Sequence, residues 1–145
     1  MTGRKLLALI CGLVSAWGFI WAGKMIATDA GYIEPAGLEY MSRDQVATYF
    51  ASQPMPVYAT LLIVSIIGAF FGGFIVSNMT RREGAGFNLS MIVAAFLILG
   101  GLVNFFIVLP GQPAWLMAAT LISYIPVTWF GHKFAHIMPF SEEIR

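Results

Sequence analysis

The chain has 145 residues and a formal net charge of +1; 59% of its residues are hydrophobic and only 10% are charged. A globular domain typically carries about 25% charged residues, so this chain has too few of them to form a water-facing surface. The composition argues against a soluble enzyme and a disordered chain. It also argues against a nucleic-acid-binding protein, because no basic run is longer than two residues.

Four stretches are long and apolar enough to cross a bilayer, since a membrane-spanning helix needs about 20 mostly apolar residues. In chain order they are residues 6–26, 57–79, 88–109 and 114–132. Each is longer than a strand of a membrane barrel. The sequence therefore predicts an all-α fold, in which residues 1–145 form a single transmembrane domain. We expect an integral membrane four-helix bundle made of two hairpins.

The first stretch also has one feature of a secretory signal peptide, because Arg4 and Lys5 precede its apolar run. The run is longer than the ~7–15-residue core of a signal peptide, so we interpret it as a permanent span. Cys11 is the single cysteine, which excludes an intrachain disulfide and a CxxC redox pair. We expect it to be a small packing residue.

Residues 27–56, between the first two spans, form the longest polar segment. Ser42 and Gln45 have the spacing of a capping box, which predicts a helix from there to about Ser52. Three apolar residues share one face of this helix: Val46, Tyr49 and Phe50. The pattern is typical of a short amphipathic helix at the outer membrane surface. It would be a lid over the bundle or a docking surface for a partner.

The basic residues predict which ends of the helices face the cytoplasm. One side of the membrane would hold Arg4, Lys5, Arg81, Arg82, Lys133 and Arg145, and the other only Lys24 and Arg43. Cytoplasmic flanks carry an excess of Lys and Arg. The sequence therefore predicts that both termini are cytoplasmic, in an inner (plasma) membrane.

Small residues recur in the spans at spacings that let helices approach closely. They are Gly12, Ala16, Gly68, Gly72, Gly73, Gly100 and Gly101. Close backbone approach matters in a bilayer because lipid supplies no hydrophobic drive between helices. We expect these residues to pack within the bundle, or to form a contact with another copy or another subunit.

The middle of each span holds no Asp, Glu, Lys, Arg or His, which argues against an ion-coupled carrier. Asn104 is the one strongly polar side chain well inside a span. It would hydrogen-bond across helices, with Ser15, Thr120 or Ser123 as partner, or line a ligand cavity. Pro126 removes a backbone donor from the last span, so a kink is expected there.

Two histidines, His132 and His136, stand four residues apart and would share a helix face. They are weak metal candidates, because a zinc site needs at least three protein ligands. No catalytic or phosphate-binding motif is present. We therefore expect no cofactor and no enzymatic activity.

The second hairpin carries a recognisable pattern of glycine, proline and aromatic residues. It comprises residues 100–104, Pro110 to Trp115, Tyr124 to Pro126, and Gly131. In this region the chain resembles a group of small bacterial four-helix hypothetical membrane proteins. The resemblance implies a four-helix membrane fold and assigns no catalytic residue.

Two functional hypotheses follow. The first is a non-enzymatic membrane subunit or scaffold that packs against a larger membrane protein complex. Its partners would be lipids and other membrane subunits or a second copy, and no nucleic acid. The second is a small oligomeric transporter, channel or lipid-handling protein, working near Asn104 and the Pro126 kink.

Overall fold

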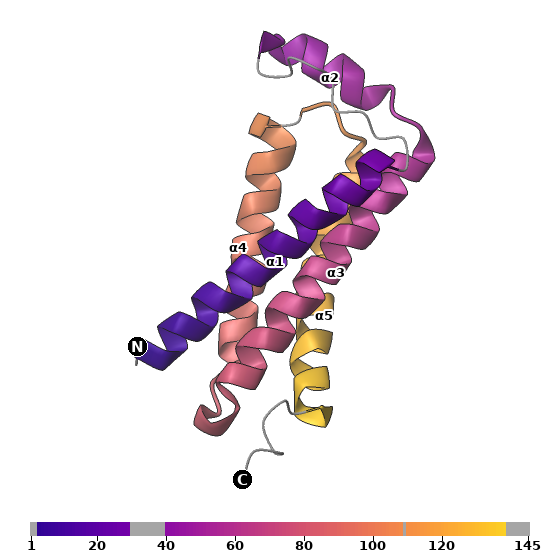
Figure 1. Cartoon of the computed structure of the whole chain (residues 1–145). Helices are drawn as coiled ribbons and strands as arrows, with labels where there is room; N and C mark the ends of the chain where they lie inside the picture. Colours follow the sequence, from indigo (N-terminus) through magenta and orange to yellow (C-terminus); the bar gives the residue numbers. More distant parts are fainter. Residues whose placement is uncertain (1–2, 30–39, 109, 139–145) are drawn as a thin grey trace.

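The computed structural model describes residues 3–29, 40–108 and 110–138, and every regular element within these ranges is helical. The elements are α1 (Gly3–Asp29), α2 (Arg43–Ala51), α3 (Met55–Met79), a 3-10 turn (Arg81–Glu83), α4 (Gly86–Val103), a π-helical turn (Asn104–Val108) and α5 (Ala114–Ile137) (Figure 1).

Four of these helices are long and apolar enough to cross a membrane, which indicates an integral membrane protein. The qualifying stretches are Gly3–Gly23, Met55–Met79, Gly86–Val108 and Ala114–Ile137. They overlap the four predicted spans. The last helix continues past the predicted end at residue 132 as far as Ile137.

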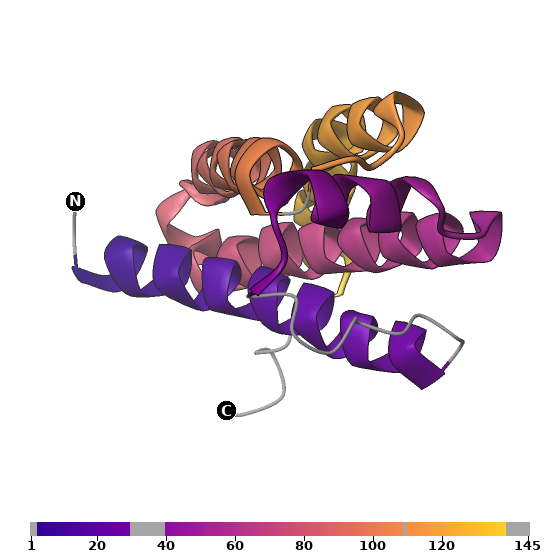
Figure 2. The same ribbon diagram turned by 90° about the horizontal axis from the view of Figure 1, so that it is seen from above.

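Helix α3 is the centre of the bundle. It packs extensively against α1 and α5 and also contacts α4, whereas α1 touches α4 only slightly. Figure 2 shows α3 between α1 on one side and α4 and α5 on the other. Of the described long helices, α1 therefore rests mainly on a single neighbour.

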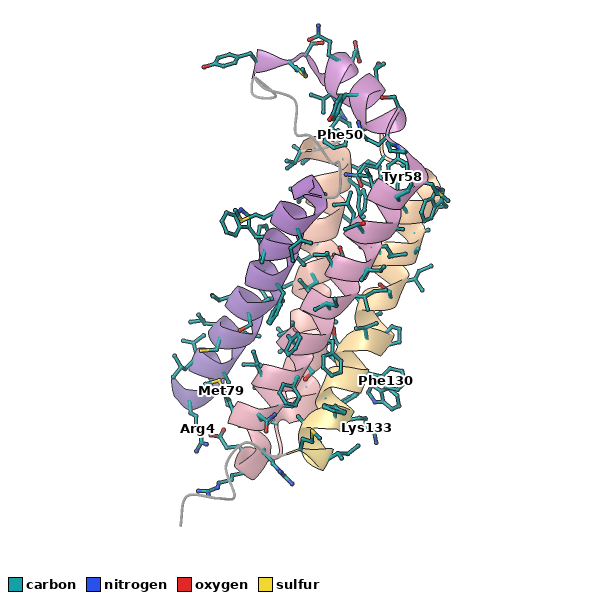
Figure 3. All side chains as sticks on the ribbon, turned by 45° about the vertical axis from the view of Figure 1, so that its right-hand side comes forward. Arg4, Phe50, Tyr58, Met79, Phe130 and Lys133 are labelled. Atoms are coloured by element: carbon teal, nitrogen blue, oxygen red, sulfur yellow. The ribbon has the colours of Figure 1, made fainter. Side chains whose placement is uncertain are left out.

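The start of α1 and the end of α3 meet at one end of the bundle, where polar contacts tie them together. The Nε atom of Arg4 donates to the carbonyl of Met79 at 3.2 Å (Figure 3). Arg4 and Lys5 each lie 3.8 Å from a carboxylate oxygen of Glu83, in the turn after α3. Gly84 follows with a φ of 63°, a left-handed conformation that glycine adopts without strain.

At the opposite end, α2 lies across the bundle (Figure 1). Both capping-box bonds at its start are present: the Ser42 hydroxyl accepts from the Gln45 N–H, and the Gln45 side chain accepts from the Ser42 N–H. Val46 and Phe50 are buried against Val57 of α3, and Tyr49 packs beside them. The apolar face of α2 therefore packs on the bundle as a lid would, and its role in docking a partner stays a prediction.

Two polar contacts hold α2 on the bundle. The Tyr58 hydroxyl of α3 donates to the Phe50 carbonyl (Figure 3). The Arg43 guanidinium donates to the Phe106 carbonyl at 2.9 Å, in the π-helical turn. The helix thus covers the end of the bundle nearest to Asn104.

Candidate functional site

Small residues bring α1 and α3 into close contact. Gly12 and Ala16 of α1 face Gly68 and Gly72 of α3. A Cβ atom added to Gly72 would lie 3.0 Å from the Ala16 Cβ and 3.2 Å from the Gly12 carbonyl oxygen. One added to Gly68 would lie 2.7 Å from the Ala16 carbonyl oxygen. These four residues therefore face each other inside the bundle and are not available to a partner.

A second close approach joins α3 and α5 through Gly73 and Gly131. A Cβ on Gly73 would lie 2.8 Å from the Thr128 Cγ2 and closer still to the Thr128 carbonyl oxygen. A Cβ on Gly131 would lie 2.9 Å from the Phe74 backbone nitrogen. Real Cβ atoms essentially never come this close, so both positions require glycine at the observed helix separation.

Gly100 and Gly101 lie instead beside a cavity of about 110 Å³ in the half of the bundle nearest to α2. All four long helices contribute to its lining, which consists of Trp17, Ile20, Leu61, Ser65, Leu97, Gly100, Gly101, Asn104, Phe105, Gln112, Leu116, Thr120 and Tyr124. No charged side chain is among these described residues. The cavity is thus apolar with a few neutral polar groups, as small-molecule sites usually are.

Three lining residues of α5, Leu116, Thr120 and Tyr124, recur every four residues and so share one face of the helix. Eight residues of helix rise correspond to about 12 Å. The cavity is therefore a slot that runs along the helices. Tyr124 is buried in its wall, and its hydroxyl lies beside the Ser65 hydroxyl of α3.

The Asn104 side chain lines this slot. Within the described ranges its amide makes no hydrogen bond, and the Ser123 hydroxyl, one of its predicted partners, donates instead to the Thr120 carbonyl at 2.8 Å. Asn104 also begins the π-helical turn. Turns of this kind are rare and are frequently found at functional sites.

A buried polar cluster, the Ser77–Ser90–His132 cluster, lies near the opposite end of the bundle. The Ser77 hydroxyl is 2.8 Å from the Ser90 hydroxyl and 2.9 Å from the His132 Nδ1. Ser90 also donates to the Gly86 carbonyl at 2.7 Å. The Nδ1 atom of His132 therefore faces the interior of the bundle. Ser77 and Ser90 are 1% and 0% exposed, so they are out of reach of a substrate.

The positions of two serines in the sequence indicate part of this cluster. Ser77 and Ser90 lie at nearly equal distances from the turn that joins α3 to α4. Residues equidistant from the turn of an antiparallel helix pair become neighbours. Two serines placed in this way in apolar helices indicate a shared hydrogen bond.

His132 and His136 stack edge to face, with ring centroids 4.8 Å apart. Among the described residues, no three His, Cys, Asp or Glu side chains come together in a way that could hold a metal ion. The carbonyl of His136 accepts from Arg81 at 3.4 Å, which links the end of α5 to the turn after α3.

Helix α5 runs through Pro126 without interruption, and Pro126 itself is exposed. Thr128, two residues further along, is fully buried, and its hydroxyl has no hydrogen-bond partner among the described atoms. Proline has no backbone N–H, so one carbonyl of the preceding turn loses its hydrogen bond. A nearby Ser or Thr hydroxyl can donate to such a carbonyl, but the Thr128 hydroxyl makes no such bond.

No protein-family model matches the sequence, and comparisons with curated proteins and with solved structures found no match either. The resemblance of the second hairpin to small bacterial membrane proteins therefore stays a prediction. The size and lining of the cavity are therefore the basis for inferring a function.

Proposed function

We propose that this chain is a non-enzymatic, lipid-handling membrane protein that binds a lipid-soluble molecule in the cavity beside Asn104. The observation that supports the proposal is the Asn104 side chain at the wall of a largely apolar slot, where its amide makes no hydrogen bond within the described residues. An amide without a partner in hydrocarbon is costly, and a ligand that pairs with it removes that cost.

The experiment compares the molecules that co-purify with wild type, Asn104→Leu and Asn88→Leu. Asn88 is the matched control, because it lies on the same helix and is exposed, away from the cavity. Mass spectrometry of extracts should find one lipid-soluble compound enriched over bulk membrane lipid in wild type and Asn88→Leu. In Asn104→Leu the enrichment of this compound should fall about tenfold, which is the effect of losing one buried hydrogen bond. Bulk lipid composition in all three proteins would refute the proposal.

We further propose that the end of the bundle with Arg4, Lys5 and Arg82 faces the cytoplasm of a bacterial cell, so that both termini are cytoplasmic and α2 lies at the outer membrane surface. The support is the excess of basic residues at that end. The test uses single-cysteine proteins in a Cys11→Ala background. A membrane-impermeant maleimide should label Ser52→Cys in intact spheroplasts and Asn88→Cys only after lysis. The reverse labelling would contradict this orientation.

A second candidate function is a subunit or scaffold of a larger membrane complex. Because α1 packs mainly on α3, much of the surface of α1 is exposed. Val14 and Trp21, for example, are each 65% exposed. A helix with one neighbour has room for a partner helix. A photo-crosslinking residue at Val14 should then capture a protein in native membranes, whereas one at the equally open Ile122 of α5 should capture lipid. Lipid at both positions would reject this candidate.

A further inference from the structure

The cavity has the size of a single six-membered ring. Its volume is about 110 Å³, and an apolar core cavity of about 150 Å³ is known to hold benzene. A whole lipid does not fit in such a volume. Any lipid-soluble ligand of this slot must therefore keep only one compact part inside and leave the rest outside the bundle.

The lining selects a flat, neutral group that accepts hydrogen bonds. Aromatic rings of Trp17, Phe105 and Tyr124 border the slot, and flat rings stack well on such walls. Asn104 and Tyr124 supply donors from two different helices. With no charged side chain among the lining residues, a phosphate or carboxylate would stay unpaired, which is strongly unfavourable in a bilayer.

One side of the slot faces the lipid, between α1 and α4. These two helices contact each other only slightly. Trp17 lines the slot and is nevertheless 62% exposed. On the α4 side, a Cβ added to Gly100 would meet only the Trp17 ring, at 3.7 Å. A Cβ at Gly100 would thus fit in ordinary van der Waals contact with Trp17. Because Trp17 both lines the slot and is largely exposed, this edge, the Trp17–Gly100 gap, is where the slot reaches the lipid.

From these observations we propose that the ligand is of the benzoquinone type: a planar ring with carbonyl oxygens, carrying an apolar tail. The ring stacks in the slot and its carbonyls accept hydrogen bonds from Asn104 and Tyr124. The tail leaves through the Trp17–Gly100 gap into the hydrocarbon. This proposal rests on the proposed lipid-binding function and names the chemical class of its ligand.

The experiment uses Trp17 as the reporter in protein reconstituted into nanodiscs. Trp21, Trp115 and Trp129 are replaced by Phe, so that contact quenching by a benzoquinone reports Trp17 alone. Because Trp17 is also exposed to lipid, saturable quenching distinguishes binding in the cavity from collisions in the bilayer. Three probes are compared: a benzoquinone with a decyl tail, the same ring without a tail, and decylbenzene, which has the tail but no carbonyl. Decylbenzene does not quench, so its binding is measured as competition.

We expect saturable quenching by the tailed quinone and weak or non-saturable effects of the other two probes. Asn104→Leu should weaken the apparent affinity of the tailed quinone about tenfold. Equal competition by decylbenzene, or no saturation with any probe, would overturn the quinone assignment. The co-purification experiment would still decide the proposed function independently, because it detects any enriched lipid-soluble compound.

The opening is tested by filling it. Gly100→Leu places a side chain in the gap without a backbone clash, and it should abolish saturable quenching. Gly18→Leu is the matched control, because nothing lies within 4 Å of a Cβ at that position on the open side of α1. It should leave the binding curve unchanged. Undiminished binding by Gly100→Leu would show that the tail does not leave between α1 and α4.

Discussion

The neighbours Gly72 and Gly73 give a direct test of the helix contacts, because they face different helices. Gly73 meets the Thr128 backbone of α5, and Gly72 meets Ala16 of α1, where an added Cβ would be 3.0 Å from its nearest neighbour. Gly73→Ala forces α3 and α5 apart by several tenths of an ångström. Gly72→Ala requires shifts of only a few tenths of an ångström, by Ala16 and the Gly12 carbonyl of α1 and by the Val93 side chain of α4. At Gly18 the same substitution meets open space.

The expected magnitudes follow from two opposing effects. Overpacking a well-packed contact costs about 1–3 kcal/mol, whereas replacing glycine by alanine within a helix gains up to about 1 kcal/mol. Gly73→Ala should therefore lower the free energy of unfolding by roughly 1–2 kcal/mol, and Gly18→Ala should leave it unchanged or raise it. A difference of about 2 kcal/mol between these two variants corresponds to a roughly thirtyfold difference in their unfolding equilibrium constants.

The measurement is an SDS titration of the purified protein in mild detergent, followed by circular dichroism. The order of stability should be Gly18→Ala highest, then Gly72→Ala, then Gly73→Ala. Gly131→Ala separates the same α3–α5 contact. The double variant Gly73→Ala/Gly131→Ala should therefore lose less free energy of unfolding than the two single variants lose in sum. Equal midpoints for Gly73→Ala and Gly18→Ala would refute the close α3–α5 approach.

Three further substitutions probe other contacts, two by the same titration and one by amide hydrogen exchange. Ser77→Ala should destabilise by about 0.6–1.7 kcal/mol, because Ser90 and His132 lose their shared partner; an equal cost of Ser77→Ala in a His132→Phe background would contradict that link. Ser42→Ala should cost up to about 1 kcal/mol of α2 stability, seen as faster amide exchange confined to α2; unchanged exchange would show that the capping box contributes nothing. Glu83→Gln should change the stability by less than about 1 kcal/mol, since its partners Arg4 and Lys5 are partly exposed; a larger loss at low salt would show a stronger network.

Helix length and local capping could be predicted because both are local properties of the sequence. Runs of about 20 apolar residues locate the spans, and the Ser42–Gln45 spacing locates the start of α2. The last turn of α5 lies beyond the predicted span because Lys133 ends the apolar run, whereas polar residues at a helix end are compatible with a continued helix.

The cavity could not be predicted, because its lining combines residues from four helices whose relative rotation the sequence does not reveal. The four spans are hydrophobic on all sides, so periodicity does not identify an inner face. Asn104 could be singled out as polar, but its neighbours Trp17 and Tyr124 are distant in sequence. For the same reason the sequence identified Gly68 and Gly73 as packing residues without indicating which helix each one meets.

The π-helical turn Asn104–Val108, which continues directly from α4, sets the angular phase of the residues within it. A π turn accommodates one residue more than an α turn, and each residue of an α-helix corresponds to about 100° of rotation. Phe105 lines the cavity and the Phe106 carbonyl meets Arg43 only in this phase. Deleting one residue between Asn104 and Val108 would restore a regular α-helix of nearly the same length, yet it would turn both groups away from their partners.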